Sequence, residues 1–329
     1  MAAELIAEIG SVHDGSFGNA VKLIEAAAKC GAHAVKFQTH IAEAETLRNA
    51  PNPPYFKGEP RFDYFRRTGF SLPQWLTLAA ECAANHVKFL SSPFSLEAVD
   101  LLEKVGVDSY KIPSGEVTNL PLLRKVAATG KPVYLSSGMS DWAELDAAVE
   151  ALRPSSRLVV LQCSSAYPCP PESVGLNVMA EMRTRYGVEV GFSDHTLGVA
   201  APIAAVALGA VVIEKHFTFS RAMYGSDALN GTEPAEFKQL ADALADVSAM
   251  LAHPVNKSDV SAFGDMKRIF EKSIVAARDL AAGHALAEGD LAFKKPGTGI
   301  PAAQTEQLLG RKLRRAVATD HQFNLSDVE

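Results

Sequence analysis

The sequence of 329 residues predicts a (β/α)₈ TIM barrel followed by a small β-rich domain. Eight short apolar segments alternate with longer segments of helical periodicity, which is typical of an α/β fold with a parallel sheet. Nearly every predicted strand is apolar at its start and polar at its end. Barrel enzymes place their catalytic residues at that carboxyl-terminal rim, so this pattern also favours a catalytic barrel.

The eight strands are expected at residues 5–10, 34–40, 88–94, 109–115, 132–138, 157–165, 189–195 and 211–217. Amphipathic helices are expected between them, among others at 19–30, 96–105, 120–129 and 141–152, with the last barrel helix at 234–251. Gly31, Gly106 and Gly130 are suited to end the first three of these helices. The stretch 51–71 interrupts the alternation, and is either a binding loop or a surface excursion packed by its own aromatic residues.

The predicted domains are a barrel at 1–252, a linker at 253–271 and a β-rich domain at 272–329, with a brief helix around 305–309. The last domain has fewer than about 60 residues and is marginal alone. We therefore expect it to pack against the barrel or against another subunit.

Composition excludes several classes of protein. A net charge of -6 and a pI near 5.9 argue against a nucleic-acid binder. No segment offers the roughly 20 apolar residues that span a bilayer, and the N-terminus lacks a signal peptide, so we expect a soluble cytoplasmic protein. The four cysteines include no Cys-x-x-Cys pair and are expected to be reduced.

The region 188–219 holds two predicted strands joined by a helix, and the strands end in Ser193-Asp194-His195 and Glu214-Lys215-His216. Parallel neighbours bring their carboxyl ends together, so the two histidines can reach one point. A lone histidine there is usually structural, but two favour a divalent transition metal.

Polar residues at the ends of the strands indicate an anion site. They include three lysines and several serines, a combination that suits a phosphate. The residues are Glu8, Lys36, Gln38, Ser91, Ser92, Lys111, Ser114, Ser136, Ser137, Ser164, Ser165 and Lys215. Cys163 is interpreted as a small packing residue.

These residues lie in motifs whose order and spacing resemble those of the sialic acid synthase family, which makes nine-carbon 2-keto sugar acids from phosphoenolpyruvate and a mannosamine-type sugar. The motifs are Ala7-Glu8-Ile9-Gly10, Val35-Lys36-Phe37-Gln38-Thr39, Ser91-Ser92-Pro93-Phe94, Lys111-Ile112-Pro113-Ser114-Gly115-Glu116, Ser136-Ser137-Gly138, Gln162-Cys163-Ser164-Ser165-Ala166-Tyr167-Pro168, Ser193-Asp194-His195-Thr196 and Glu214-Lys215-His216. The tail, with Lys294-Lys295-Pro296-Gly297, resembles the antifreeze-like SAF domain of that family.

The resemblance implies a divalent ion, manganese with magnesium or cobalt as alternatives, bound by His195 and His216, with Glu8 close to the reacting atoms. It implies that phosphoenolpyruvate is surrounded by Lys36, Ser92, Lys111, Ser114, Ser136, Ser165 and Lys215. It implies that the sugar contacts Gln38, Glu116, Tyr167 and Asp227, and that Ser193 also binds substrate. It further implies a domain-swapped homodimer in which Lys295 enters the neighbour's site.

Several positions depart from the family pattern, and most lie where the sugar is expected. They are Val12 for Asn, Ser220 for Asp, Ser226-Asp227-Ala228 for Pro-Asp-His, Gly231 for Ser and Lys295 for Arg. The departures leave the particular sugar open: the resemblance implies N-acetylmannosamine or a related N-acylated amino sugar, with a diacetamido-trideoxyhexose of legionaminate- or pseudaminate-type pathways as the alternative.

Two further hypotheses belong to other classes. A pyruvate aldolase would use Lys111 or Lys215 to form a Schiff base. A non-catalytic sugar-binding protein would have kept the barrel alone, but it would have no use for Glu8, two histidines and a phosphate site.

Overall fold

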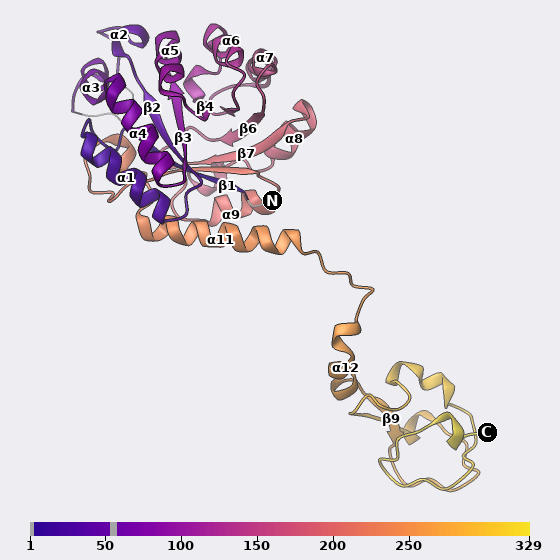
Figure 1. Ribbon diagram of the computed structural model, residues 1–329. Coiled ribbons are helices and arrows are strands. Elements are labelled where there is room, and N and C mark those ends of the chain that lie inside the picture. The colour runs from indigo at the N-terminus through magenta and orange to yellow at the C-terminus, as the bar shows by residue number, and fades with distance from the viewer. Residues whose placement is uncertain (1–2, 53–57) are drawn as a thin grey trace. The chain divides into compact units, whose positions relative to one another are not determined.

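The computed structural model describes residues 3–52 and 58–329, which form two compact units, Met1–His253 and Pro254–Glu329 (Figure 1). In the first unit eight parallel strands close a barrel in chain order, and β8 pairs with β1. The strands are β1 (Glu4–Gly10), β2 (Ala34–Thr39), β3 (Lys88–Pro93), β4 (Ser109–Ile112), β5 (Val133–Ser136), β6 (Leu158–Cys163), β7 (Glu189–Asp194) and β8 (Val212–His216). The predicted TIM barrel is confirmed.

Most strands end slightly earlier than the sequence predicted. β4 stops at Ile112 rather than at Gly115, because Pro113 has no N–H to continue the ladder and the 3₁₀ turn Ser114–Glu116 follows it. The polar residues expected at the strand ends therefore lie partly on the rim loops.

Helices surround the barrel (Figure 1). They are α1 (Phe17–Lys29), α4 (Leu72–Ala84), α5 (Leu96–Val105), α6 (Leu120–Ala128), α7 (Trp142–Leu152), α8 (Val178–Tyr186), α9 (Ala200–Ala207) and α11 (Pro234–Ala252). Ser16, Ser95, Asn119 and Asp141 each accept a backbone N–H in the first turn of a helix, which explains where α1, α5, α6 and α7 begin. Gly31, Gly106 and Gly130 all have positive φ, as expected of residues that follow a helix.

The stretch 51–71 contains a helix, α3 (Arg61–Thr68), that the sequence analysis did not predict, and a short α2 (Ala42–Glu45) precedes the stretch. Phe62 and Tyr64 of α3 are buried, so this stretch packs partly by its own aromatic residues. Part of it, 53–57, lies outside the described residues.

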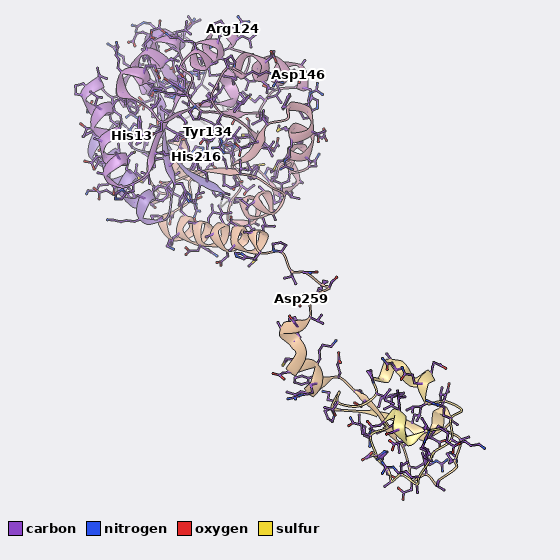
Figure 2. The ribbon with its side chains drawn as sticks, turned by 45° about the vertical axis from the view of Figure 1, so that its right-hand side comes forward. His13, Arg124, Tyr134, Asp146, His216 and Asp259 are labelled. Atoms are coloured by element: carbon purple, nitrogen blue, oxygen red, sulfur yellow. The ribbon has the colours of Figure 1, made fainter. Side chains whose placement is uncertain are left out.

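Strand alternation decides which side chains enter the barrel. A separate apolar cluster fills its interior and includes Ile6, Ala34, Leu90, Tyr134 and Val212. Figure 2 shows Tyr134 and His216 within the barrel, with Arg124 and Asp146 on the outer helices. Because side chains alternate between the two faces, Glu214 and His216 of β8 point inward with Val212, and Lys215 points outward with Ile213, which belongs to the core under the helices.

The second unit has its own small core around Ile274, Leu308 and Phe323, and β9 (Ser273–Ala276) pairs antiparallel with β10 (Leu291–Lys294). The predicted linker 253–271 carries α12 (Gly264–Phe270). The backbone carbonyl oxygen of Arg268 in this helix accepts a hydrogen bond from the backbone N–H of Gly297. The helix expected around 305–309 is a 3₁₀ helix at Ala302–Gln307.

Among residues 3–52 and 58–329, no helix has the length and apolar character needed to cross a bilayer.

A short helix, α10 (Ser226–Leu229), lies near the barrel rim.

Candidate active site

A buried network of charges occupies the barrel interior at the carboxyl ends of the strands. The Nζ atom of Lys36 lies 3.3 Å from Oε2 of Glu8 and 3.2 Å from Oε1 of Glu214, and the Nζ atom of Lys111 lies 3.4 Å from the same Glu214 oxygen. All four side chains are at most 6% exposed. Two cations and two carboxylates from four strands therefore share one enclosed space.

Burial and pairing set the protonation of these groups. Burial raises the pKa of Glu8 to about 7, with Lys36 acting against it. Burial also disfavours charge on Glu214, but Lys111 and Lys36 outweigh it and lower the pKa of Glu214 to about 2. For Lys36, Glu214 and Glu8 outweigh burial and raise its pKa, whereas burial prevails at Lys111 and lowers its pKa. Glu214 is thus the permanent anion, and Glu8 is the carboxyl group that can exchange a proton near neutral pH.

Serines line the network. Lys111 donates to Oγ of Ser136 at 2.7 Å, and Lys36 lies 3.5 Å from Oγ of Ser92. The hydroxyl of Ser193 donates to Glu214 at 3.1 Å. These hydroxyls and lysines present several hydrogen-bond donors toward the space that a small anion would occupy.

The two predicted metal ligands face one another. The ring centroids of His195 and His216 lie 5.5 Å apart, and the ring of Tyr167 packs against that of His195 at 4.2 Å with the planes tilted by 37°. The Nδ1 atom of His195 donates to the carbonyl oxygen of Ser164 at 2.9 Å, which leaves its Nε2 as the atom available to a metal. Burial by itself lowers the pKa of His195, but its contacts with Cys163 and Ser164 outweigh burial and raise it.

His216 supplies the second nitrogen. Its Nδ1 atom is buried and has no hydrogen-bond partner among the described residues, and burial lowers its pKa to about 4, so the ring is neutral at pH 7. A buried neutral imidazole of this kind fits a transition metal. No group of three or more His, Cys, Asp or Glu side chains suited to a metal ion occurs within 3–52 and 58–329.

The residues predicted to meet the sugar lie on several rim segments. Gln38 donates from Nε2 to Oε1 of Glu8 at 2.8 Å, and Asp227 accepts from the N–H and hydroxyl of Ser11. Gly10 has φ +53°, and a Cβ there would lie 2.4 Å from Oδ2 of Asp227, so glycine lets this carboxylate approach the end of β1. Burial raises the pKa of Glu116, which accepts a hydrogen bond from Asn119.

The hydroxyls of Ser114 and Ser165 both lie next to Gly138, since a Cβ at that glycine would collide with both of them. Ser114 also lies 3.8 Å from Sγ of Cys163, which in turn lies 3.8 Å from Nδ1 of His195. Cys163, interpreted from the sequence as a packing residue, thus borders the candidate metal site.

One predicted site residue lies outside this interior, and another belongs to the second unit. Lys215 lies on the outer face of β8, where its ammonium pairs with Asp194 and donates to the carbonyl oxygen of Thr196. Lys295 belongs to the second unit, where its Nζ atom lies 4.8 Å from the ring centroid of Phe270. The placement of Lys215 around phosphoenolpyruvate therefore needs correction, since the alternation of β8 turns it away from the barrel interior.

Glu214 is the residue that the sequence analysis left out of the site. It stands beside Lys215 in the same triplet, and the period-two alternation that places Val212 and His216 inward places Glu214 inward too. In a sequence, a lysine indicates an anion site more directly than a glutamate does, so residue type alone predicts Lys215 and not Glu214 as the site residue.

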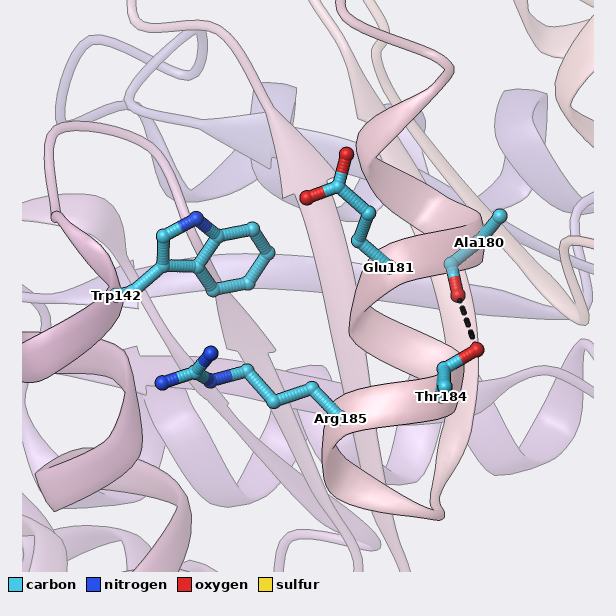
Figure 3. A pocket seen from close by; sticks show the side chains of 5 residues that line it. All are labelled: Trp142, Ala180, Glu181, Thr184 and Arg185. Atoms are coloured by element: carbon cyan, nitrogen blue, oxygen red, sulfur yellow. Dashed lines mark hydrogen bonds between the residues drawn. The ribbon is translucent and has the colours of Figure 1, made fainter.

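A further surface hollow lies between α7 and α8 and is lined by Trp142, Ala180, Glu181, Thr184 and Arg185 (Figure 3). Arg185 lies over the Trp142 ring and pairs with Asp146. These helices cover the outside of the barrel, so the hollow is separate from the charged interior.

Comparison with known proteins agrees with this geometry. Residues 23–256 match the NeuB family, and residues 271–329 match the SAF domain. The chain is 37% identical to the N,N'-diacetyllegionaminic acid synthase of Campylobacter jejuni, over 93% of this chain and 94% of that protein. It is 32% identical to a pseudaminic acid synthase of the same species, over 98% of this chain and 96% of that protein.

A solved structure of a sialic acid synthetase from Leptospira borgpetersenii, in complex with citrate, superposes with a TM-score of 0.72 at 28% identity. The match covers 81% of this chain and 91% of that one. The barrel, the SAF unit and these relatives lead to one conclusion: the chain belongs to the NeuB family.

Proposed function

We propose that this protein is a nonulosonic acid synthase, which condenses phosphoenolpyruvate with N-acetylmannosamine or a related N-acylated amino sugar and releases phosphate. The observation that carries the proposal is the buried Lys36–Glu214–Lys111 cluster beside Glu8 and the two facing histidines. The three relatives compared above are synthases of sialic, legionaminic and pseudaminic acids, which supports the same class of reaction.

The reaction forms a bond between C3 of phosphoenolpyruvate and the aldehyde carbon of the sugar. Positive charge develops at C2, water adds there, and the resulting tetrahedral carbon expels phosphate by cleavage of its C–O bond. Lys36 and Lys111, with Ser92 and Ser136, would hold the phosphate and carboxylate of phosphoenolpyruvate in place during these steps. Glu214 keeps the two ammonium groups at fixed positions before the anion binds.

Glu8 is suited to handle the proton of the added water. Its pKa of about 7 lets the carboxylate accept that proton near neutral pH, and the amide of Gln38 orients the acceptor oxygen. Asp227, Tyr167 and Glu116 lie on rim segments from which they would hydrogen-bond to hydroxyls of the sugar.

His195 and His216 would hold a divalent ion, manganese in our proposal, with magnesium and cobalt as alternatives. The unpartnered Nδ1 atom of His216 and the free Nε2 atom of His195 support this assignment. When bound, such an ion supplies a Lewis acid that polarises the aldehyde oxygen.

The proposal also includes a domain-swapped homodimer, in which Lys295 enters the site of the partner. It is supported by the exposure of Lys295 on the second unit and by the match of that unit to the SAF domain. We place the enzyme in the cytoplasm, where its four free cysteines would stay reduced.

An aldolase mechanism is less compatible with the lysines. Lys215 pairs with Asp194 on the outer face of β8, so of the two lysines considered for a Schiff base only Lys111 lies in the charged interior. Borohydride treatment with pyruvate would trap a covalent adduct on Lys111 if the aldolase reading were correct.

The test of the proposal measures phosphate release from phosphoenolpyruvate with manganese. The sugars are N-acetylmannosamine, its 6-phosphate and the 2,4-diacetamido-2,4,6-trideoxyhexoses, the last because of the relatives named for legionaminic and pseudaminic acids. We expect release with one of them and its loss on chelation. No release with any sugar, in protein that binds manganese and phosphoenolpyruvate, would contradict the proposed acceptor class.

A further inference from the structure

A chain of hydrogen bonds leads from Glu8 outward to α2. Gln38 donates from Nε2 to Glu8, and its Oε1 lies 3.1 Å from Nε2 of His40. The other ring nitrogen of His40, Nδ1, lies 2.7 Å from Oε1 of Glu45. The side chains of His40 and Glu45 are only 7% and 5% exposed, so water does not replace these contacts. Neither His40 nor Glu45 was singled out as a site residue from the sequence.

The hydrogen-bond partners of His40 determine which of its ring nitrogens carry a proton. The NH₂ group of Gln38 donates to Glu8, and the carbonyl oxygen of Gln38 can only accept a hydrogen bond. Nε2 of His40, which lies next to that oxygen, must therefore carry a proton. The carboxylate of Glu45 also accepts, at one oxygen from Nδ1 of His40 and at the other from the N–H of Ile41 at 3.2 Å. A histidine that donates from both nitrogens is an imidazolium.

Two aromatic rings hold that imidazolium in place. Phe65 of α3 stacks on one face with centroids 3.8 Å apart and planes 9° apart, and Phe94 stacks on the other at 4.1 Å and 23°. Aromatic faces attract a cation, and the two rings together prevent the imidazole from rotating. Charged and titratable groups near this pocket include Arg61, whose guanidinium carbon lies 5.6 Å from the ring centroid of Phe65, and Glu116 and His13. Burial raises the pKa of Glu116, with Glu45 adding to the effect, and burial lowers the pKa of His13, with His40 adding to the effect.

The opposite amide orientation would be unfavourable. If Gln38 turned its carbonyl oxygen toward the ionised carboxylate of Glu8, two acceptors would face one another. An N–H at Nε2 of His40 disfavours that orientation further, because it would meet the NH₂ group of Gln38. The ring thereby controls which atom of Gln38 the carboxylate of Glu8 meets.

We propose that His40, held by Glu45 and clamped between Phe65 and Phe94, is a positioning residue that fixes the Gln38 amide and through it the carboxylate of Glu8. The catalytic meaning of this role rests on the proposed function, in which Glu8 handles a proton. His40 itself does not touch the reacting atoms.

The first test is independent of turnover. Protein labelled with ¹⁵N-histidine is examined by NMR at neutral pH, with the His40 signals assigned by their loss in His40→Gln. We expect both ring nitrogens of His40 to be protonated in the unmodified protein and in Glu43→Gln, a control on the same helix whose side chain is 57% exposed and pairs with Arg66. Glu45→Gln should shift the ring toward the neutral form. A neutral His40 in the unmodified protein would overturn the proposal.

The second test separates positioning from packing. His40→Gln keeps an N–H donor for Gln38, whereas His40→Leu keeps bulk without one. With the two variants of similar melting temperature, we expect His40→Leu to lose about tenfold or more in kcat relative to His40→Gln, as for other residues that orient a catalytic group. The KM for phosphoenolpyruvate should change less than kcat in both, since Lys111 and Ser136 belong to β4 and β5, outside the chain from His40 to Glu8.

Equal losses in His40→Gln and His40→Leu would overturn the positioning role. If the unmodified protein releases no phosphate with any sugar, the proposed function fails, and the NMR measurement still decides whether His40 donates from both nitrogens.

Discussion

Lys111 and Lys215 illustrate how little separates a site residue from a structural one. Both lie near the end of a strand, both are almost fully buried, and each pairs with a carboxylate, Glu214 and Asp194 respectively. They differ in the face of the strand to which they belong. Lys111 points into the barrel and Lys215 points toward the helices, so the same residue type has two functions.

We predict opposite consequences for the two lysines. Lys215→Met should lower the free energy of unfolding by roughly 3–5 kcal/mol, because Asp194 remains buried without its cation, and should leave the KM for phosphoenolpyruvate unchanged. Lys111→Met should raise that KM by about tenfold or more and cost less stability, since Lys36 still neutralises Glu214. Denaturant unfolding and initial rates measure the two quantities. An equal loss of phosphoenolpyruvate binding in both variants would contradict the assigned faces.

His13 predicts a pH dependence of stability. Burial lowers its pKa to about 4, below the 6.5 that is ordinary for histidine, so the unfolded chain binds a proton first as the pH falls. The free energy of unfolding should therefore decrease between pH 6.5 and 4, by up to about 3 kcal/mol from this residue. Stability curves of the metal-free protein at several pH values measure it.

The variant His13→Asn isolates that contribution. Its Oδ1 can still accept from the backbone N–H of Gly15, as Nδ1 of His13 does, but it does not titrate. We expect a shallower loss of stability on acidification than in the unmodified protein, while His216, whose pKa burial also lowers, still contributes a loss and Glu8, whose pKa burial raises, opposes it. The control is His86→Asn at an exposed position whose φ of 60° asparagine tolerates. An unchanged pH slope in His13→Asn would contradict the prediction.

At the scale of elements, the second unit contains an internal repeat of three residue types with equal spacing. In each copy an aspartate accepts from an arginine, a histidine and a backbone N–H three residues before it. The copies are Arg278, His284 and Asp290 with Ala287, and Arg315, His321 and Asp327 with Asn324. These buried carboxylates organise two turns of a unit that has little regular secondary structure.

We predict that Asp290→Asn loosens this unit without affecting the barrel. The N–H of Ala287 and His284 outweigh burial and lower the pKa of Asp290 to about 2, so its contribution is complete above pH 3.8 and is lost as the pH falls through 2. Removing the charge should cost roughly 1–3 kcal/mol locally. Hydrogen exchange of backbone amides in 273–294 of the full chain measures it, with Asp265→Asn, whose side chain is 91% exposed, as the control. Unchanged protection in Asp290→Asn would show that the contacts carry no stability.

At the scale of the whole molecule, the barrel and the second unit each bury a separate core. We predict that a chain ending at His253 keeps the melting temperature of the barrel and binds phosphoenolpyruvate normally. In the proposed dimer the second unit contributes Lys295 to the sugar side, so the KM for the sugar should rise by about tenfold or more, or 1.4 kcal/mol. Rates measured against each substrate separately check this, and equal losses for both substrates would argue against a covering role of the second unit.

Much of this molecule could be predicted from its sequence. The eight strands, their order and most helix ends follow from hydrophobic periodicity, capping residues and glycines, which are local properties of the chain. Helix α3 escaped prediction because its aromatic and charged residues pack against a neighbouring segment rather than showing a simple apolar stripe. The departure from the family pattern at Ala228 was expected at the sugar, yet that side chain is fully buried in the main core.

The sequence by itself determined that Lys36, Lys111, His195 and His216 lie at the carboxyl ends of barrel strands, since strand order and polarity are written along the chain. Only the tertiary structure decided that Glu214 belongs with them, that Lys215 does not, and that His40 reaches Glu8 through Gln38. The physical reason is that a residue belongs to the site only if its side chain lies on the inner face of its strand or is hydrogen-bonded to the site from another segment. Both conditions are fixed only when the barrel closes.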